Sequence, residues 1–194
     1  MISSGNIEDG FENIYFSAGK DGFLVKWTDD NNGEHYQITE LEIKMISVSP
    51  NGKEIAVYET DGGLINRVSV WNWETLTRKF ARRFSDSVTS ISYTANGNYI
   101  MVGTATVDGV VFLRSSNGDV VSNKIRESTG IVSYAITSKT EKTAVMYSPA
   151  GSLAYYNLFT GRLTKKFNVE QGLSNTVLFN NYLFFNFNMI LTKF

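Results

Sequence analysis

The chain has 194 residues, of which 42% are hydrophobic and 13% aromatic, and this apolar content suffices for a continuous core and excludes a disordered chain. It contains no cysteine, which excludes disulfides and thiolate chemistry, and one histidine, which excludes many catalytic triads. The net charge is −1 and no apolar run approaches the roughly 18 residues of a membrane span, so neither nucleic acid nor a membrane is an expected partner.

An internal repeat of about 43 residues runs along the chain. Three Asp-Gly steps mark it, at Asp21, Asp61 and Asp108, and each leads into a strand-like run. One aligned position recurs at intervals of 44, 43 and 42 residues and carries Trp27, Trp71, Arg114 and Tyr156. Four short strands in each unit of this length are typical of the blades of a β-propeller.

Alternation of apolar and polar residues, with Asn-Gly and Asp-Gly turns between the runs, predicts the strands. The first repeat predicts three, at residues 13–19, 23–29 and 34–40, and its innermost strand is not evident in residues 1–11. The second and third predict four each, at residues 44–50, 54–60, 67–73, 77–84, 88–94, 99–105, 110–116 and 120–126. The fourth and the incomplete fifth predict strands at residues 132–138, 143–149, 152–158, 162–168, 174–179, 182–186 and 189–194.

We therefore predict an all-β fold with about 16–18 short antiparallel strands in a single, incomplete β-propeller. The expected divisions are blade one at 11–43, blade two at 44–86, blade three at 87–128, blade four at 129–171 and part of blade five at 172–194.

The first repeat resembles the WD-repeat β-propellers. In "YFSAGKDGFLVKW", Ser17, Asp21 and Trp27 fall on the serine, turn aspartate and tryptophan of that family. The resemblance implies that these residues form a structural hydrogen-bond network. The repeats are degenerate, and the other structural positions that we align with them are Trp71, Thr104, Asp108 and Tyr156.

The expected function is that of a non-catalytic scaffold, which binds a partner protein through the loops of one propeller face. The loop between Asp61 and Trp71 is four residues longer than its counterpart in the first repeat, and such insertions commonly mark a binding face. The partner-binding residues that we expect on this face are Asp61, Gly63, Leu64, Asn66, Arg67, Asp86 and Glu127. The alternative is a ligand-binding or hydrolytic propeller with a polar site at the mouth of the central channel.

No pattern in the sequence predicts a catalytic residue, a cofactor or a metal site. The acidic run at 29–34 looks like a calcium loop but lacks its spaced ligands, so a solvated turn is expected. The basic run at 78–83 suits an exposed outer strand, where charge prevents edge pairing, and it could also bind phosphate or an acidic partner. No signal peptide is recognisable at the N-terminus, and we expect a cytoplasmic protein.

Charge is divided along the chain, because residues 1–66 hold 12 acidic and 4 basic side chains while residues 67–194 hold 7 acidic and 14 basic ones. In a repeat array the two ends should therefore carry opposite charge. We expect either head-to-tail pairing of two chains or a place within a larger propeller. Trp27 and Trp71 are expected to be largely buried between blades, and Gly97 and Gly109 to adopt positive φ angles.

Overall fold

The computed structural model of the protein describes residues 2–5, 14–28, 32–105, 109–121, 134–137, 142–148, 151–158, 160–168, 176–179, 182–185 and 192–193. These residues form 18 β-strands and no helix, and every strand pair is antiparallel. The all-β prediction and the expected number of strands are confirmed.

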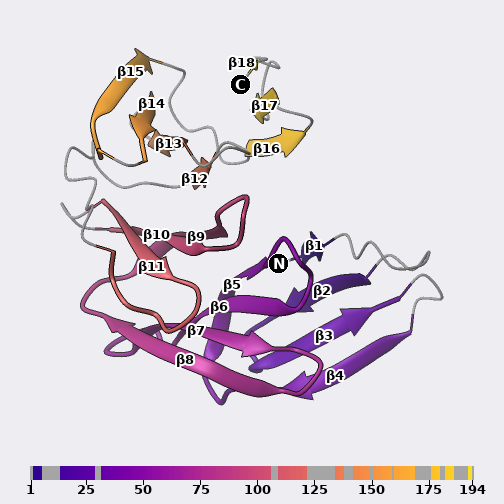
Figure 1. The fold of residues 1–194 in the computed structure, drawn as a ribbon. Coiled ribbons are helices and arrows are strands. Elements are labelled where there is room, and N and C mark those ends of the chain that lie inside the picture. Colours follow the sequence, from indigo (N-terminus) through magenta and orange to yellow (C-terminus); the bar gives the residue numbers. More distant parts are fainter. Residues whose placement is uncertain are drawn as a thin grey trace.

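The strands form five consecutive sheets, each a meander in chain order (Figure 1). The first sheet holds β1 (Ile2–Gly5), β2 (Ile14–Ala18), β3 (Phe23–Trp27) and β4 (Gly33–Gln37). The second holds β5 (Glu42–Val48), β6 (Glu54–Thr60), β7 (Asn66–Asn72) and β8 (Thr77–Phe84), and the third β9 (Val88–Tyr93), β10 (Tyr99–Thr104) and β11 (Val110–Arg114). The fourth holds β12 (Tyr134–Thr137), β13 (Thr143–Ser148), β14 (Ser152–Asn157) and β15 (Leu163–Asn168), and the fifth β16 (Thr176–Phe179), β17 (Tyr182–Phe185) and β18 (Thr192–Lys193).

The first sheet begins with a strand that the repeat pattern does not reveal. β1 pairs with β2 from Ile2 opposite Ser17 to Gly5 opposite Ile14, so the innermost strand precedes residue 11. The outer strand expected at 120–126 is represented by one bridge, between Leu113 and Val120, and residues 122–126 lie outside the described part. Among the described strands the fifth sheet does not pair with the first, and the division of the chain into blades stays a prediction.

Glycine at the tight turns allows the meander to form. Gly97 adopts φ 72° between β9 and β10, and Gly109 adopts φ 61° just before β11, as expected. The Gly97 N–H donates to the Thr94 carbonyl over 2.9 Å, which closes the turn. Side chains with a Cβ rarely adopt this left-handed region, so the glycines decide where the strands reverse.

Adjacent sheets pack face to face, and three apolar cores fill the spaces between the first four sheets in turn. The second and third sheets contribute to two cores each, because their central strands carry apolar side chains on both faces. Buried pairs that represent the three cores in order are Phe16 with Ile55, Val70 with Ile100, and Met101 with Tyr156. Each such aliphatic or aromatic side chain stabilises the fold by about 1.5–3 kcal/mol through burial.

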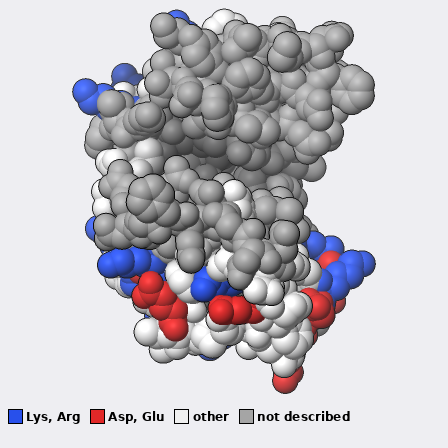
Figure 2. All heavy atoms as spheres, turned by 90° about the vertical axis from the view of Figure 1, so that its right-hand side faces the viewer, with Lys and Arg blue, Asp and Glu red and all other residues white. Residues whose placement is uncertain are grey.

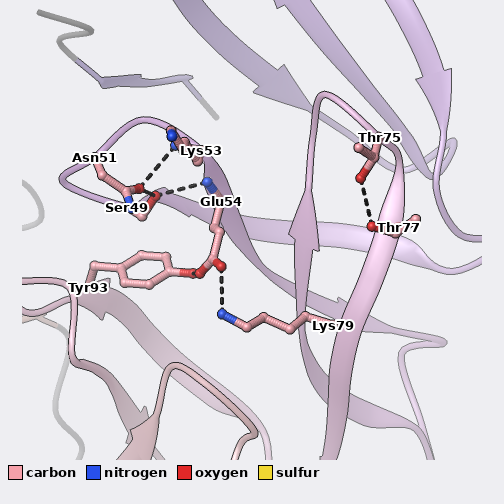
Figure 3. A network of polar contacts seen from close by, with 8 residues as sticks. All are labelled: Ser49, Asn51, Lys53, Glu54, Thr75, Thr77, Lys79 and Tyr93. Carbon is pink, nitrogen blue, oxygen red and sulfur yellow. Dashed lines mark hydrogen bonds and ion pairs between the residues drawn. The ribbon is translucent and has the colours of Figure 1, made fainter.

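Polar contacts also join the second sheet to the third (Figure 3). The Glu54 carboxylate on β6 accepts from Lys79 Nζ on β8 at 2.6 Å and from the Tyr93 hydroxyl on β9 at 3.4 Å. The Tyr93 backbone N–H donates to Ser47 Oγ on β5 over 3.0 Å. Burial and the neighbouring Glu54 carboxylate raise the pKa of Tyr93 well above its ordinary value. These contacts help to fix how the third sheet lies against the second.

A glycine permits the closest approach between the second and third sheets. Gly118 has φ 77° and follows β11, and a Cβ built on it would lie 2.4 Å from Phe80 Cδ2 on β8. The Gly118 carbonyl also accepts from Arg82 Nη1 at 3.4 Å. The outer edge of the second sheet is therefore shaped to fit this turn.

We predict that Gly118→Ala destabilises the protein, because alanine meets both the left-handed backbone and the Phe80 ring. Left-handed strain costs about 1–2 kcal/mol, and overpacking adds about 1–3 kcal/mol. Urea unfolding followed by tryptophan fluorescence measures the loss. Gly63→Ala is the matched control, because its Cβ would meet nothing closer than Asp61 Oδ1 at 3.8 Å. Equal stability of the two variants would mean that the turn does not pack on β8.

Candidate functional site

The turn between β2 and β3 lies against the link from β4 to β5. Gly22 accepts at its carbonyl from the N–H groups of Ile38 and Thr39, at 3.2 and 3.4 Å. A Cβ on Gly22 would stand 2.0 Å from the Thr39 carbonyl oxygen, so the two segments touch through their backbones. The Thr39 side chain in turn hydrogen-bonds to Glu59, near the end of β6. We call this end of the first two sheets the loop rim, with residues 20–22, 38–41, 61–65 and 85–87.

The long loop between β6 and β7 is held by its own side chains. Asp61 Oδ1 accepts from the backbone N–H groups of Gly63 and Ile65, each at 2.9 Å, and Thr60 Oγ1 accepts from the Gly62 N–H at 3.0 Å. The bonds from Ile65 and Gly63 hold the pKa of Asp61 below its ordinary value. Asp61 therefore organises the loop, since its carboxylate is already engaged by the backbone.

Leu64 stands at the tip of this loop with 96% of its surface exposed. It is the most exposed of the large hydrophobic residues in the described chain. Asn66, at the base of the loop, is buried instead, and its Oδ1 accepts from the Tyr58 hydroxyl at 2.7 Å. The loop thus has an anchored base and an apolar tip.

Below the loop lies a buried ionic network that the sequence analysis did not anticipate. The Glu59 side chain on β6 is 0% exposed, and Arg67 on β7 donates to it through Nε at 3.0 Å and Nη2 at 2.8 Å. Ser69 Oγ donates to the same carboxylate at 2.6 Å and accepts from Trp71 Nε1 at 2.9 Å. Burial raises the pKa of Glu59, but hydrogen bonds from Arg67, Ser69 and Thr39 outweigh burial and lower it below its ordinary value.

The register of the hairpin is the signal that could have located this network. Thr60 pairs with Asn66 and Glu59 with Arg67, so a hairpin drawn across the loop places the two charges opposite each other. Arg67, expected to bind a partner, uses its guanidinium for this internal pair. Asp86 accepts from Ser85 Oγ at 3.0 Å in the link after β8, and Glu127 lies outside the described residues.

The repeat positions form only part of the network that the family resemblance implies. Trp27 Nε1 donates to Ser17 Oγ at 2.8 Å, and Asp21 Oδ1 accepts from the Phe23 N–H at 3.3 Å within the turn. Thr104 and Tyr156 are buried, as is normal for structural positions, and Asp108 lies outside the described residues.

The prediction that Trp27 is largely buried is wrong, and the prediction for Trp71 is met in part. Trp27 is 36% exposed, because it pairs with Tyr15 on the face of the first sheet that points away from the second. No described sheet covers that face. Trp71 is half-buried beside the first core, and its ring lies 5.6 Å from the guanidinium carbon of Arg78.

Within the described part of the chain, no group of three or more His, Cys, Asp or Glu side chains could hold a metal ion. The same residues include no helix with the length and apolarity needed to cross a membrane.

We predict that Arg67→Ala destabilises the protein by about 3–5 kcal/mol, because it leaves the buried Glu59 carboxylate without its counter-ion. Glu59→Gln should cost less, since the amide still accepts from Ser69 and Arg67 can turn toward water. Because the pKa of Glu59 is lowered by folding, its stabilisation is present above the unfolded pKa and is lost as pH falls through the folded one.

Urea unfolding between pH 7 and about pH 3 tests both statements. Glu59→Gln should flatten the decline of stability toward acid, whereas the exposed control Lys165→Ala should stay within about 0.5 kcal/mol of wild type at each pH. A larger loss of unfolding free energy at pH 7 for Glu59→Gln than for Arg67→Ala would contradict the view that Arg67 compensates a buried Glu59 charge.

Comparison with known proteins identifies related sequences. A family model described as an N-terminal beta-propeller domain matches residues 4–186. An "Uncharacterized protein" of Treponema pallidum (strain Nichols) is 38% identical over 171 residues, which are 88% of this chain and 28% of that protein. The chain therefore spans less than a third of the length of this relative.

A solved structure shares the architecture. The crystal structure of the Cps50 (Swd1) beta-propeller domain of Myceliophteria thermophila superimposes with a TM-score of 0.72 over 89% of this chain and 58% of that one. At 14% sequence identity this similarity shows the fold alone, and it confirms the β-propeller prediction. From the match over residues 4–186 and the five consecutive antiparallel meanders, we conclude that the chain belongs to the family of N-terminal β-propeller domains.

Proposed function

We propose that this propeller is a non-catalytic scaffold that binds a partner protein through the loop rim. The observation that carries the proposal is Leu64, whose side chain is 96% exposed at the tip of the longest turn on this rim. Burial of one leucine against a partner favours binding by about 1.5–3 kcal/mol. A single exposed leucine is common on proteins, so the support comes from how this one is held.

The loop keeps its shape without a partner. The Asp61 carboxylate and the Thr60 hydroxyl bind backbone N–H groups of the loop, and Asn66 anchors its base inside the sheet. A pre-ordered loop loses little conformational freedom on binding, so more of the contact energy appears as affinity. The Glu59–Arg67 pair beneath the loop adds a rigid support.

We predict that Leu64→Asp weakens peptide binding by at least about tenfold, which is the loss of one buried apolar contact. Random peptides displayed on phage are selected on the wild-type protein, and the affinity of the enriched clones is then measured for each variant. Leu76→Asp is the matched control, because Leu76 is also exposed but lies in the turn between β7 and β8, at the other end of the second sheet. Loss of binding in both variants, or in neither, would count against the loop rim.

We also propose that a second copy of the chain covers the open face of the first sheet. Tyr15 and Trp27 are 38% and 36% exposed there, and Phe23 and Val25 are half-buried. The charge of residues 1–66 is −8 and that of residues 67–194 is +7, so a head-to-tail arrangement brings opposite charges together.

We expect a mass in solution of twice the 21.7 kDa chain and an interface of more than about 1,000 Å². Light scattering coupled to size-exclusion chromatography measures the mass. Trp27→Glu should give a folded monomer, because the carboxylate would be buried at the centre of the contact. A wild-type protein that stays monomeric at high concentration excludes the pairing and leaves the loop-rim proposal untouched.

A further inference from the structure

The outer strand β8 carries four basic side chains, and three of them have a partner within the protein. Arg78 lies over the Trp71 ring, Lys79 pairs with Glu54 at 2.6 Å, and Arg82 donates to the Gly118 carbonyl at 3.4 Å. Arg83 is exposed and has no hydrogen bond or ion pair with any described residue. It is the one cation of this strand that has no partner among the described residues.

The strand register makes the position of Arg83 unfavourable for stability. Arg83 is directly opposite Arg67 on β7, and Arg67 is directly opposite Glu59 on β6. Both donor bonds of Arg67 go to Glu59, whose carboxylate also accepts from Ser69. This row of three strands therefore holds two guanidinium groups and one carboxylate. Like charges directly opposite each other on a sheet destabilise it, so one positive charge lacks compensation.

The same register places this charge beside the loop. Asn66 begins β7 directly after the loop and pairs with Phe84, the last residue of β8. Only Phe84 therefore separates Arg83 from the part of the loop rim that follows β8. Leu64 projects from that rim, fully exposed. In Figure 1, β8 is the outermost strand of the second sheet, and Arg83 is exposed near the end of this strand.

We propose that Arg83 binds a carboxylate of a protein partner, an Asp or Glu side chain next to an apolar side chain that packs on Leu64. This inference rests on the proposed function of the loop rim and names the chemistry of its partner. The planar guanidinium matches a carboxylate through two parallel hydrogen bonds, and arginine is enriched among residues that dominate interfaces.

Nucleic acid fits the same surface poorly. Glu40, Asp61 and Asp86 lie on the loop rim, and residues 1–66 carry a net charge of −8, which repels a polyanion. Figure 2 presents the right-hand side of Figure 1, which is not the end of the sheets that carries the loop rim, and there too Lys and Arg side chains are interspersed with Asp and Glu over the described part. A short segment with one carboxylate meets Arg83 without approaching these acidic groups as closely as a phosphate chain would.

The experiment uses the full chain and random peptides displayed on phage, selected in parallel on wild type and on Arg83→Glu. Wild type should enrich peptides with Asp or Glu beside Leu, Ile or Phe, and Arg83→Glu should bind those clones at least tenfold more weakly. Synthetic versions with the acidic residue changed to Lys should recover binding to Arg83→Glu. Lys165→Glu, an exposed charge reversal on β15, is the matched control and should bind like wild type.

Folding provides a second readout. Arg83→Glu removes the repulsion from Arg67, so its thermal midpoint should be no lower than that of wild type. A lower midpoint would mean that Arg83 supports the fold, and it would overturn the inference.

The remaining outcomes separate this inference from the proposed function. One outcome is a set of clones that need Leu64, lack acidic residues and bind Arg83→Glu normally. These clones would support binding at the loop rim and refute the carboxylate partner. Clones that depend on neither residue, or no enriched clone, refute both. Binding of a fluorescent single-stranded DNA oligonucleotide tests for a phosphate site. If this binding is salt-sensitive, and is abolished by Arg83→Glu but not by Leu64→Asp, the surface binds phosphate and the proposal is overturned.

Discussion

Sheets with apolar side chains on both faces need a neighbour on each side, and this requirement organises the described chain. On β6, Val57 points into the core shared with the first sheet and Tyr58 into the core shared with the third, and both are buried. The second sheet is therefore stable only between two others. The first sheet satisfies the same requirement on one side alone, since Phe16 is 1% exposed and its neighbour Tyr15 is 38% exposed. This difference explains why we assign an assembly role to that face.

Two glutamates at the packed sheets are bonded by neighbouring side chains, and these bonds help to set how one sheet lies on the next. Glu54 links β6, β8 and the Tyr93 hydroxyl on β9, and Glu59 is bonded by Arg67, Ser69 and Thr39. A buried charge without such partners would cost several kcal/mol. The Glu59 network lies directly under the longest loop of the rim. The loop that presents Leu64 is thus attached to the core through its base as well as ordered by Asp61.

The strands and turns were predictable because their causes are local. Asn96-Gly97 reverses the chain since glycine accepts φ 72°, and the apolar alternation of "RVSVW" is visible in a few residues. The strand at Ile2–Gly5 was not predictable, because "ISSG" lacks an apolar pattern and becomes a strand by pairing with β2. The burial of Trp27 was predicted wrongly, because a strong repeat position says nothing about whether a further sheet covers it.

The amino-acid sequence by itself determined the repeat, the turns, the antiparallel meanders and the choice of the loop after Asp61 as the candidate site. Each of these depends on residues close together in the chain, where backbone sterics and side-chain alternation decide the outcome. Only the tertiary structure decided which charges meet. Arg67 became an internal partner of Glu59, and Arg83 came to lie opposite Arg67 without a partner among the described residues, because strand register sets these neighbours. Contacts between strands depend on the summed burial of whole sheets, which no short segment encodes.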